Sequence, residues 1–385
     1  GDPESVNQMY ETYEQVTIDD IQRVAGKYFV PSNRTVIRLT LEKQASGGES
    51  CNGQSTRDES QPLTPNPFPP EGDERESGAA SEGESDCGQA TAVIPARQGQ
   101  PAPTGDTILL NDKSPLVAIR ILYTVGSKDD PQGKEGLAAL TSRMLPEGGT
   151  RRYSNEQILE RLYPMAAAIG SHSDKEVTVF TGDVHRDKLA EFYDLFAEML
   201  TAPRFDPEDF ERLRDEQLNF VSKTLRGNSD ESLGKWTLQL MLYPRHPYGH
   251  VDAGTVRGLQ SIQLDDVKEF YKRNFAPLSA RLQVGVAGGA DEAFVNRLRK
   301  DFRSSPTRAV NPRELPHATM PKDQEVAVVQ KGCIATAISI GFPLDLTRSD
   351  DDFYTLVVAN SALGEHRTFN GRLMQNMRGK RGLNY

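Results

Sequence analysis

The chain has 385 residues, of which 36% are hydrophobic, which is enough for two or three domains with cores of their own. Its net charge of −10 and the lack of a basic face argue against a nucleic-acid-binding protein. No apolar run approaches the ~20 residues of a membrane-spanning helix, and no signal-peptide pattern is present.

The N-terminal stretch has a counterpart further along the chain. VTIDDIQRVAGKYFVPSNRTVIRL at residues 16–39 resembles IQLDDVKEFYKRNFAPLSARLQVG at residues 262–285, at a constant offset of 246 residues. Both copies predict an amphipathic helix, a short turn at a proline and then a strand. We interpret the pair as an internal structural repeat, and most of the unit that ends with the first copy is expected to lie upstream of Gly1.

Residues 44–105 differ in composition from the rest of the chain. They are rich in Gly, Ser, Pro, Glu and Gln, and their ten acidic and three basic residues account for −7 of the net charge. Such a stretch buries too little apolar surface to offset the entropy of ordering, so it is expected to be a disordered linker. Cys51 and Cys87 lie in it, and the sequence leaves open whether they form a disulfide or stay free thiols.

The remainder alternates between strand and helix patterns. Alternating apolar residues predict strands at 117–125, 176–181 and 282–286. Capping signals and apolar faces predict helices that begin near residues 135, 154, 189 and 206, and a further helix at 292–302. A second unit follows, with strands at 325–329 and 334–342 and helices at 351–363 and 370–379. The pattern indicates an α+β or α/β arrangement of repeated sheet-plus-helices units.

The segment GLAALTSRMLPEGGTRRYS at 136–154 resembles the signature helix of the pitrilysin/insulinase-type zinc metallopeptidases. In that family an inverted HxxEH motif places two zinc-binding His on one helix face, and its Glu acts as general base. In this chain Ala139 and Arg143 stand at the two His positions and Ser142 at the Glu position. Ala cannot bind a metal and Arg carries a fixed positive charge. The motif is therefore degenerate, and no metal site is expected in this chain.

Two further segments carry acids and histidines that could be taken for ligands. FERLRDEQLNFV at 210–221 is similar to the family region that supplies the third zinc ligand, and it places Asp215 and Glu216 near that position. Both are expected to be solvated helix acids without partner ligands for a metal.

HPYGHVDAGTVRGLQSI at 246–262 resembles a family loop, and its His246 and His250 are four residues apart. The intervening Pro and Gly oppose a helix, so we interpret both as loop histidines rather than a metal pair.

The last segment, FNGRLMQNMRGKRGLNY at 369–385, resembles the fourth domain of the family, in which an Arg-x6-Tyr pair follows a helix. Arg378 and Tyr385 have that spacing. In the family this pair reaches the substrate near the zinc of the other half, and both groups can donate hydrogen bonds to the attacked carbonyl oxygen. The resemblance thus implies catalytic substrate contacts for Arg378 and Tyr385; a basic helix end plus a core Tyr is the alternative.

The resemblance implies the pitrilysin/insulinase (mitochondrial processing peptidase-like) fold, which is α+β. Residues 1–43 resemble the tail of the second domain, 44–105 the linker, 106–303 an inactive third domain and 304–385 the start of a truncated fourth. The implied function is the non-catalytic half of a two-half zinc metalloendopeptidase. This half would form the peptide chamber, bind extended peptides at a sheet edge and be inactive alone.

The implied partners are an upstream catalytic half of the same chain, or a homologous subunit, and unfolded peptides. Zinc is expected only in that upstream half. A second hypothesis is a non-proteolytic structural core subunit of the same fold, which an intact upstream HxxEH would exclude. An independent hydrolase that uses His246 and His250 ranks last, because it lacks a third ligand. The sequence leaves the compartment open, the periplasm or another extracytoplasmic space included.

Overall fold

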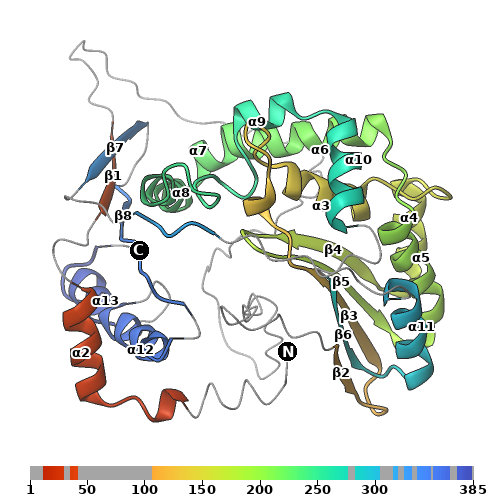
Figure 1. The fold of residues 1–385 in the computed structure, drawn as a ribbon, viewed down its shortest axis with the longest axis horizontal. Helices are drawn as coiled ribbons and strands as arrows, with labels where there is room; N and C mark the ends of the chain where they lie inside the picture. Colours follow the sequence, from red (N-terminus) through yellow and green to blue (C-terminus); the bar gives the residue numbers. More distant parts are fainter. Residues whose placement is uncertain are drawn as a thin grey trace, which may run out of the picture. The chain divides into compact units, whose positions relative to one another are not determined.

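The computed structural model describes a mixed α+β protein, as the sequence predicts (Figure 1). It describes residues 12–29, 35–41, 106–275, 282–303, 315–319, 325–331, 336–347, 350–364 and 371–383. The expected linker, with Cys51 and Cys87, and the candidate site residue Tyr385 lie outside the described residues.

The larger sheet has five strands in the order β2-β6-β3-β5-β4. The central strand β3 pairs antiparallel with both β5 and β6, β2 pairs parallel with β6, and β4 pairs antiparallel with β5. Strand β4 therefore lies at one edge of this sheet, and helix α3 packs beside it (Figure 1). The strand bounds are β2 Thr107–Leu110, β3 Leu116–Tyr123, β4 Ala168–Ser173, β5 Thr178–His185 and β6 Leu282–Gly288.

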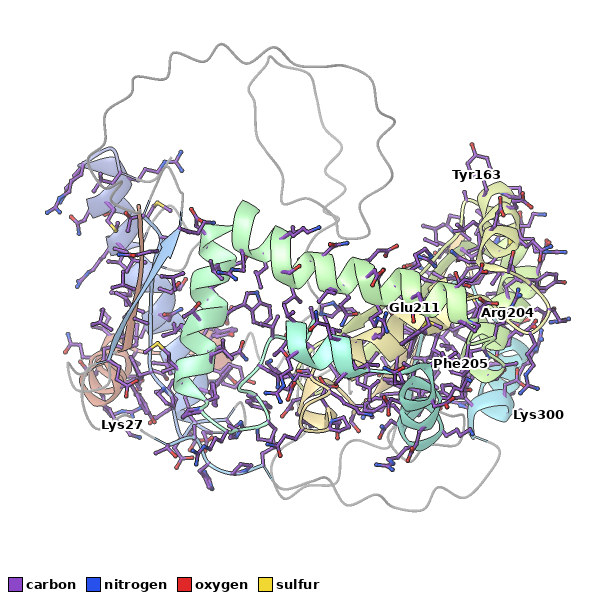
Figure 2. The ribbon with its side chains drawn as sticks, turned by 90° about the horizontal axis from the view of Figure 1, so that it is seen from above. Lys27, Tyr163, Arg204, Phe205, Glu211 and Lys300 are labelled. Carbon is purple, nitrogen blue, oxygen red and sulfur yellow. The ribbon has the colours of Figure 1, made fainter. Side chains whose placement is uncertain are left out.

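Helices cover the buried face of this sheet. Gly182 on β5 shows how closely they approach, because an added Cβ would lie only 2.9 Å from the ring of Phe192 on α5. The helices are α3 Leu137–Glu147, α4 Asn155–Leu162, α5 Leu189–Thr201, α6 Pro207–Asn219, α7 Leu225–Asn228, α8 Asp230–Leu242, α9 Val256–Ser261, α10 Leu264–Phe270 and α11 Glu292–Arg303. Tyr163 projects from the end of α4 and is 88% exposed (Figure 2).

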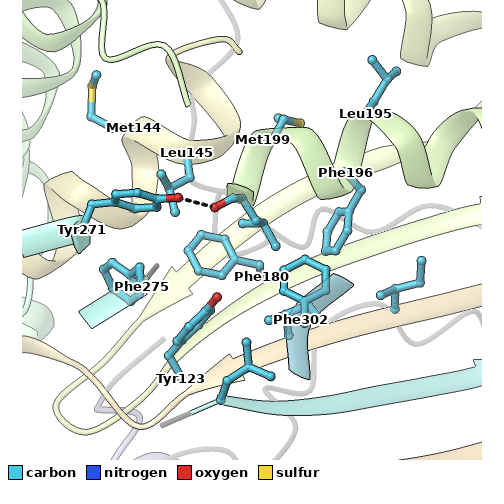
Figure 3. Close-up of a cluster of buried hydrophobic side chains, with 14 of the residues drawn as sticks. Tyr123, Met144, Leu145, Phe180, Leu195, Phe196, Met199, Tyr271, Phe275 and Phe302 are labelled. Atoms are coloured by element: carbon cyan, nitrogen blue, oxygen red, sulfur yellow. Dashed lines mark hydrogen bonds between the residues drawn. The ribbon is translucent and has the colours of Figure 1, made fainter. Parts of the chain in front are cut away.

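Four aromatic side chains form the centre of the core (Figure 3). The rings of Tyr123, Phe180 and Phe275 meet edge to face, with centroids 5.3 to 5.9 Å apart, a favourable arrangement of their quadrupoles. The hydroxyl of Tyr271 donates to the carbonyl of Leu200 at 2.8 Å. This bond gives a donor to one of the last carbonyls of α5, which have no hydrogen-bond partner within the helix. The fully buried hydroxyl of Tyr123 has no hydrogen-bond partner among the described residues.

A second, three-stranded sheet joins the two ends of the described chain. Strand β1, Thr35–Leu41, lies between β7, Val326–Lys331, and β8, Ile338–Gly341. Helix α8 packs against β1 and β8, and an added Cβ at Gly341 would lie 3.0 Å from the side chain of Leu238. Two more helices belong to this part: α12, Asp352–Gly364, and α13, Arg372–Met374, which continues as a π-helical turn to Gly379.

Helix α2, Ile18–Tyr28, packs on α12 through charged side chains. The carboxylate of Asp352 accepts hydrogen bonds from Lys27 at 2.8 Å and from Arg23 at 2.7 Å. These two cations lower the pKa of Asp352 to about 2. The N-terminal helix is thus fixed to a helix more than 300 residues later in the chain.

The helix and the strand of the internal repeat are confirmed and occupy the same place in the two sheets, whereas the expected turns at Pro31 and Pro277 lie outside the described residues. Helix α10 and strand β6 form the later copy, with β6 parallel to β2 and antiparallel to β3. Helix α2 and strand β1 form the first copy, with β1 parallel to β7 and antiparallel to β8. In both helices the carboxylate of the third residue accepts from the amide of the N-cap residue: Asp20 from Thr17 at 3.2 Å and Asp266 from Gln263 at 2.8 Å. The two sheets are therefore built from one helix–strand plan.

Most predicted elements are present, with shifted ends. The strand predicted at 176–181 runs from 178 to 185, and of the strand predicted at 334–342 only 338–341 is described as strand. Strands β2 and β4 and helices α7, α8 and α9 were missed. Short or polar sequences such as AIGSHS in β4 lack the apolar periodicity that marks an element. No described helix has the length and apolar character needed to cross a membrane.

We predict that two identical Tyr→Phe changes in the core differ in effect. Tyr271→Phe should lower the free energy of unfolding by about 1–2 kcal/mol, because the buried Leu200 carbonyl loses its donor. Tyr123→Phe should leave stability unchanged or raise it, because it removes a buried hydroxyl without a bonded partner among the described residues. Urea unfolding of both variants is the measurement. Equal losses of unfolding free energy in the two variants would contradict the hydrogen bonding described for the two hydroxyls.

Candidate functional site

Helix α3 carries the positions of the degenerate zinc motif, and its N-terminus is held by a buried acid. The carboxylate of Asp130 accepts hydrogen bonds from the backbone amides of Gly136 and Ala138, both at 2.7 Å. Such a carboxylate also interacts favourably with the positive end of the helix dipole. The ring of His250 lies 3.1 Å from the same carboxylate. Burial nevertheless raises the pKa of Asp130 above its ordinary value.

A second contact fixes the same end of α3. The side-chain amide of Gln217, on α6, donates to the carbonyls of Gly136 and Ala253 at 3.1 and 2.8 Å. Gly136 has a φ of 106° and lies so close to residues 253 and 254 that a side chain would collide with them. The sequence argument missed Asp130 and Gln217. The bonds of Gln217 and the contact of Asp130 with His250 join residues far apart in sequence, so no local pattern indicates them.

The side chains at the three motif positions are either apolar or bonded to other groups of the protein. Ala139 is partly buried and offers only a methyl group. The hydroxyl of Ser142 donates to the carbonyl of Ala139 at 2.8 Å, within the same helix. Arg143 is 8% exposed and its guanidinium forms ion pairs. No side chain at these positions is left as a metal ligand.

Arg143 joins α3 to α6 through two carboxylates. Its guanidinium donates to both oxygens of Glu147, at 3.0 and 2.9 Å, and to Glu216 at 2.7 Å. Arg212 donates to the other oxygen of Glu216 at 3.2 Å. We call these four side chains the Arg143 cluster. Burial opposes the charge of Arg143, but its two carboxylates outweigh burial and raise the pKa of the guanidinium.

The expectation of a solvated helix acid therefore holds only in part for Glu216, which forms ion pairs. Glu216 is 37% exposed and is paired with both Arg143 and Arg212. The ion pair with Arg143 was missed because this partner lies on a different helix, 73 residues earlier. Its neighbour Asp215 is exposed, as expected.

The Arg143 cluster does not fit a bound zinc ion. Zinc needs neutral or anionic ligands close together, whereas here a guanidinium stands beside the two carboxylates that could contribute. Within the described ranges, no group of three or more His, Cys, Asp or Glu residues is placed to hold a metal.

The interpretation of His246 and His250 as loop residues is confirmed. The loop that carries them lies between α8 and α9. One ring nitrogen of His246 lies 2.7 Å from the carbonyl of Pro316, and the other accepts from the amide of Tyr248 at 3.0 Å. His250 pairs with Asp130 instead. The two rings thus have separate partners.

The same loop is tied to the turn between β4 and β5. The hydroxyl of Tyr248 is hydrogen-bonded to Glu176. Lys175 pairs with Asp252 at 2.8 Å and donates to the carbonyl of His250. Asp252 also accepts from the hydroxyl of Ser127 at 2.7 Å. These bonds fix the end of edge strand β4 to the body of the domain.

Of the Arg378–Tyr385 pair, only the arginine lies among the described residues. Arg378 is half-buried in the π-helical turn Gln375–Gly379 that follows α13. The carbonyl of Arg378 accepts from the amide of Gly382 at 3.0 Å, which turns the chain back after the helix. The pairing of Arg378 with Tyr385 stays a prediction.

Two family models match the chain. Residues 107–233 match "Insulinase (Peptidase family M16)", and residues 261–385 match "Peptidase M16 inactive domain". Together they cover most of the larger sheet, its helices and the C-terminal elements.

Two curated relatives are each 24% identical to the chain over the residues that align. The zinc protease PqqE of Helicobacter pylori is 24% identical over 271 residues, 68% of this chain and 59% of the relative. The non-peptidase homolog YmxG of the same organism is 24% identical over 279 residues, 71% of this chain and 62% of the relative. The chain thus spans about 60% of the length of these relatives.

A solved structure shows the same fold. The peptidase M16 inactive domain from Pseudomonas fluorescens superposes with a TM-score of 0.61 at 21% identity, covering 74% of this chain and 68% of that one.

We predict that the charge of Arg143 contributes measurably to stability. Arg143→Met keeps most of the apolar stem but leaves Glu147 and Glu216 without their shared cation, so it should cost about 2 kcal/mol of unfolding free energy. Arg273→Met is the control, because Arg273 is 71% exposed and its pairing with Glu269, four residues earlier, should contribute less than about 1 kcal/mol. Thermal or urea unfolding tests the pair. If Arg143→Met is as mild as its control, the cluster does not hold the two helices together.

Proposed function

The chain belongs to the insulinase family, peptidase family M16, and we propose that it is the non-catalytic half of a two-half zinc metalloendopeptidase. The observation that carries the proposal is the Arg143 cluster. The peptidase-type helix α3 and its neighbour α6 are retained, but a guanidinium takes the place at which the family binds a metal. In this proposal the zinc and its HxxEH motif belong to an upstream half of the same chain, or to a homologous subunit.

The proposed role of this half is to hold an extended peptide in a chamber. The edge strand β4 supports it, because β4 has a pairing neighbour on one side only within the described part of the sheet. An unfolded peptide can add to such an edge through backbone hydrogen bonds, which require little sequence preference. Apart from Ile169, the side chains of β4 are small or polar, AIGSHS.

We further propose that Arg378 and Tyr385 reach the substrate bound at the upstream zinc. A guanidinium and a phenol are both donors, and aimed at the attacked carbonyl they would stabilise the negative charge that develops there. The assignment comes from the match of FNGRLMQNMRGKRGLNY to the family segment with this pair.

The proposed domain organisation follows the same resemblance. Residues 1–43 are the tail of a second domain, 44–105 a linker, 106–303 an inactive third domain and 304–385 the start of a fourth. The pairing of β1 with β7 and β8 adds that the first and last of these segments share one sheet.

A second candidate function is a structural subunit without proteolysis. It is favoured by one observation: the relative named a non-peptidase homolog matches this chain at the same 24% identity as the relative named a zinc protease. Similarity alone therefore does not separate the two functions. An intact HxxEH motif upstream of this chain would decide for the peptidase.

We predict that the chain by itself holds no stoichiometric zinc and hydrolyses no peptide. The reason is that Ala139, Ser142 and Arg143 offer no ligand set. Metal analysis of purified chain after washing with a chelator is the measurement. The positive control is the triple variant Ala139→His, Ser142→Glu, Arg143→His, which should gain zinc with Glu216 as third ligand. One tightly bound zinc per unmodified chain would contradict the proposal that this half is non-catalytic.

We also predict that Tyr385→Phe and Arg378→Ala lower turnover more than substrate affinity when the catalytic half is present. Loss of one donor to a developing oxyanion typically lowers kcat ~10²–10³-fold. Tyr385→Phe is the sharper probe, because it deletes one hydroxyl, whereas Arg378→Ala also removes a half-buried stem. Rates at saturating peptide, with folding checked by circular dichroism, provide the comparison. An undiminished kcat for Tyr385→Phe would assign the pair a structural role.

A further inference from the structure

The smaller sheet carries a group of exposed aliphatic side chains on one of its faces. On β7, Val326 and Val328 are 61% and 54% exposed. On β8, Ile338 and Ile340 are 55% and 56% exposed. Val326 and Ile340 lie opposite the same residue of β1, Val36, on its two sides, so they share a face of the sheet. We call the four side chains on β7 and β8 the open face of the smaller sheet.

Helix α8 packs on the opposite face of this sheet. An added Cβ at Gly341 would point at the side chain of Leu238 on α8. Gly341 directly follows Ile340, and successive residues of a strand point to opposite faces. Ile340 and the other residues of the open face therefore point away from α8.

The internal repeat relates the open face to a face of the larger sheet. The offset of 246 residues pairs Leu282 of β6 with Val36 of β1. In the larger sheet, Tyr123 of β3 lies opposite Leu282. In the smaller sheet, Ile340 of β8 lies opposite Val36. Ile340 thus holds the place that Tyr123 has in the larger sheet.

A second position gives the same correspondence. Ile121 of β3 lies opposite Val284, and Ile338 of β8 lies opposite Arg38, the residue that the offset pairs with Val284. Both β3 residues are 0% exposed, whereas their two counterparts on β8 are more than half exposed. Equivalent positions of the two sheets therefore differ in one respect: in the larger sheet they are covered.

Helices supply that cover in the larger sheet. Phe196 of α5 and Phe302 of α11 lie in the same core as Tyr123 and Phe180 (Figure 3). On α5, Phe192 and Phe196 are four residues apart and so lie on one side of the helix, with ring centroids 6.0 Å apart. The cover is an amphipathic helix with an aromatic stripe toward the sheet.

We propose that the open face of the smaller sheet is the docking surface for an amphipathic helix of this kind, contributed by the fourth domain that residues 304–385 begin. The inference rests on the proposed domain organisation. A second copy of the chain fits less well, because four side chains are far fewer than the roughly 20–30 residues that each partner contributes to a standard interface. A helix of the same polypeptide also loses less translational freedom on docking than a separate molecule.

The experiment adds a helix to the full chain from outside. The probe is a dye-labelled peptide with the sequence of α5, residues 189–201, and its control peptide carries Phe192→Asp and Phe196→Asp. Binding is measured by anisotropy of the dye. We expect saturable binding of the α5 peptide and none of the control peptide, because the aromatic stripe provides the contact with the sheet.

Variants of the chain locate the binding. Ile338→Lys and Val328→Lys should each weaken binding of the α5 peptide at least about tenfold, because the docked helix would bury an unpaired ammonium. The two positions are exposed and lie on different strands, which keeps the test valid if one variant folds poorly. Leu159→Lys is the matched control: Leu159 is 58% exposed on α4, and its replacement should change nothing.

Three results would overturn the inference. The docking surface is wrong if the α5 peptide does not bind, or if it binds both Lys variants as well as the unmodified chain. If the unmodified chain self-associates in sedimentation velocity and both Lys variants are monomeric, a second copy is the occupant instead of a helix. None of these results bears on the proposed non-catalytic role, which zinc content and the kcat of Tyr385→Phe decide.

Discussion

The ion pair between Arg143 and Glu216 is the interaction around which the candidate site is organised. It joins α3 to α6 and places a fixed positive charge on the helix that lies within the segment matched by the insulinase family model. Glu147 and Arg212 complete the charge balance of the cluster. A guanidinium that forms several directed bonds with carboxylates can join two helices as a metal cation would. It cannot activate water as zinc does.

The N-terminal end of α3 is held by a different kind of interaction. There the buried carboxylate of Asp130 bonds the free amides of the first turn, and His250 bonds that carboxylate in turn. A buried charge is costly unless it is bonded on several sides, so the loop with His250 cannot separate from α3 without a large penalty. This explains in physical terms why a histidine-rich loop is present in a chain without a described metal site: its histidines hold the loop to its surroundings.

One helix–strand plan, used twice, accounts for both sheets. In each sheet the strand of the repeat lies between a parallel and an antiparallel neighbour, and the helix of the repeat packs on a neighbouring helix, α3 in one case and α12 in the other. Strand β1 is the first described strand and β6 is the last strand of its own sheet, so the same pairing position is filled from different places in the chain.

The sequence by itself determined the elements with strong periodicity or clear caps, such as β3, α4 after Ser154 and α6 after Asp206, because those signals act within a few residues. It also indicated the family, which the two family models match, and it predicts a degenerate zinc motif at Ala139, Ser142 and Arg143. Tertiary structure alone decided that β4, with its weak local pattern, is an edge strand, and that Glu216 pairs with Arg143. It also decided that Asp130, His250 and Gln217 meet at one helix end. These contacts join residues 73 to 120 positions apart, and a local pattern carries no information on which distant charge or carbonyl a side chain will meet.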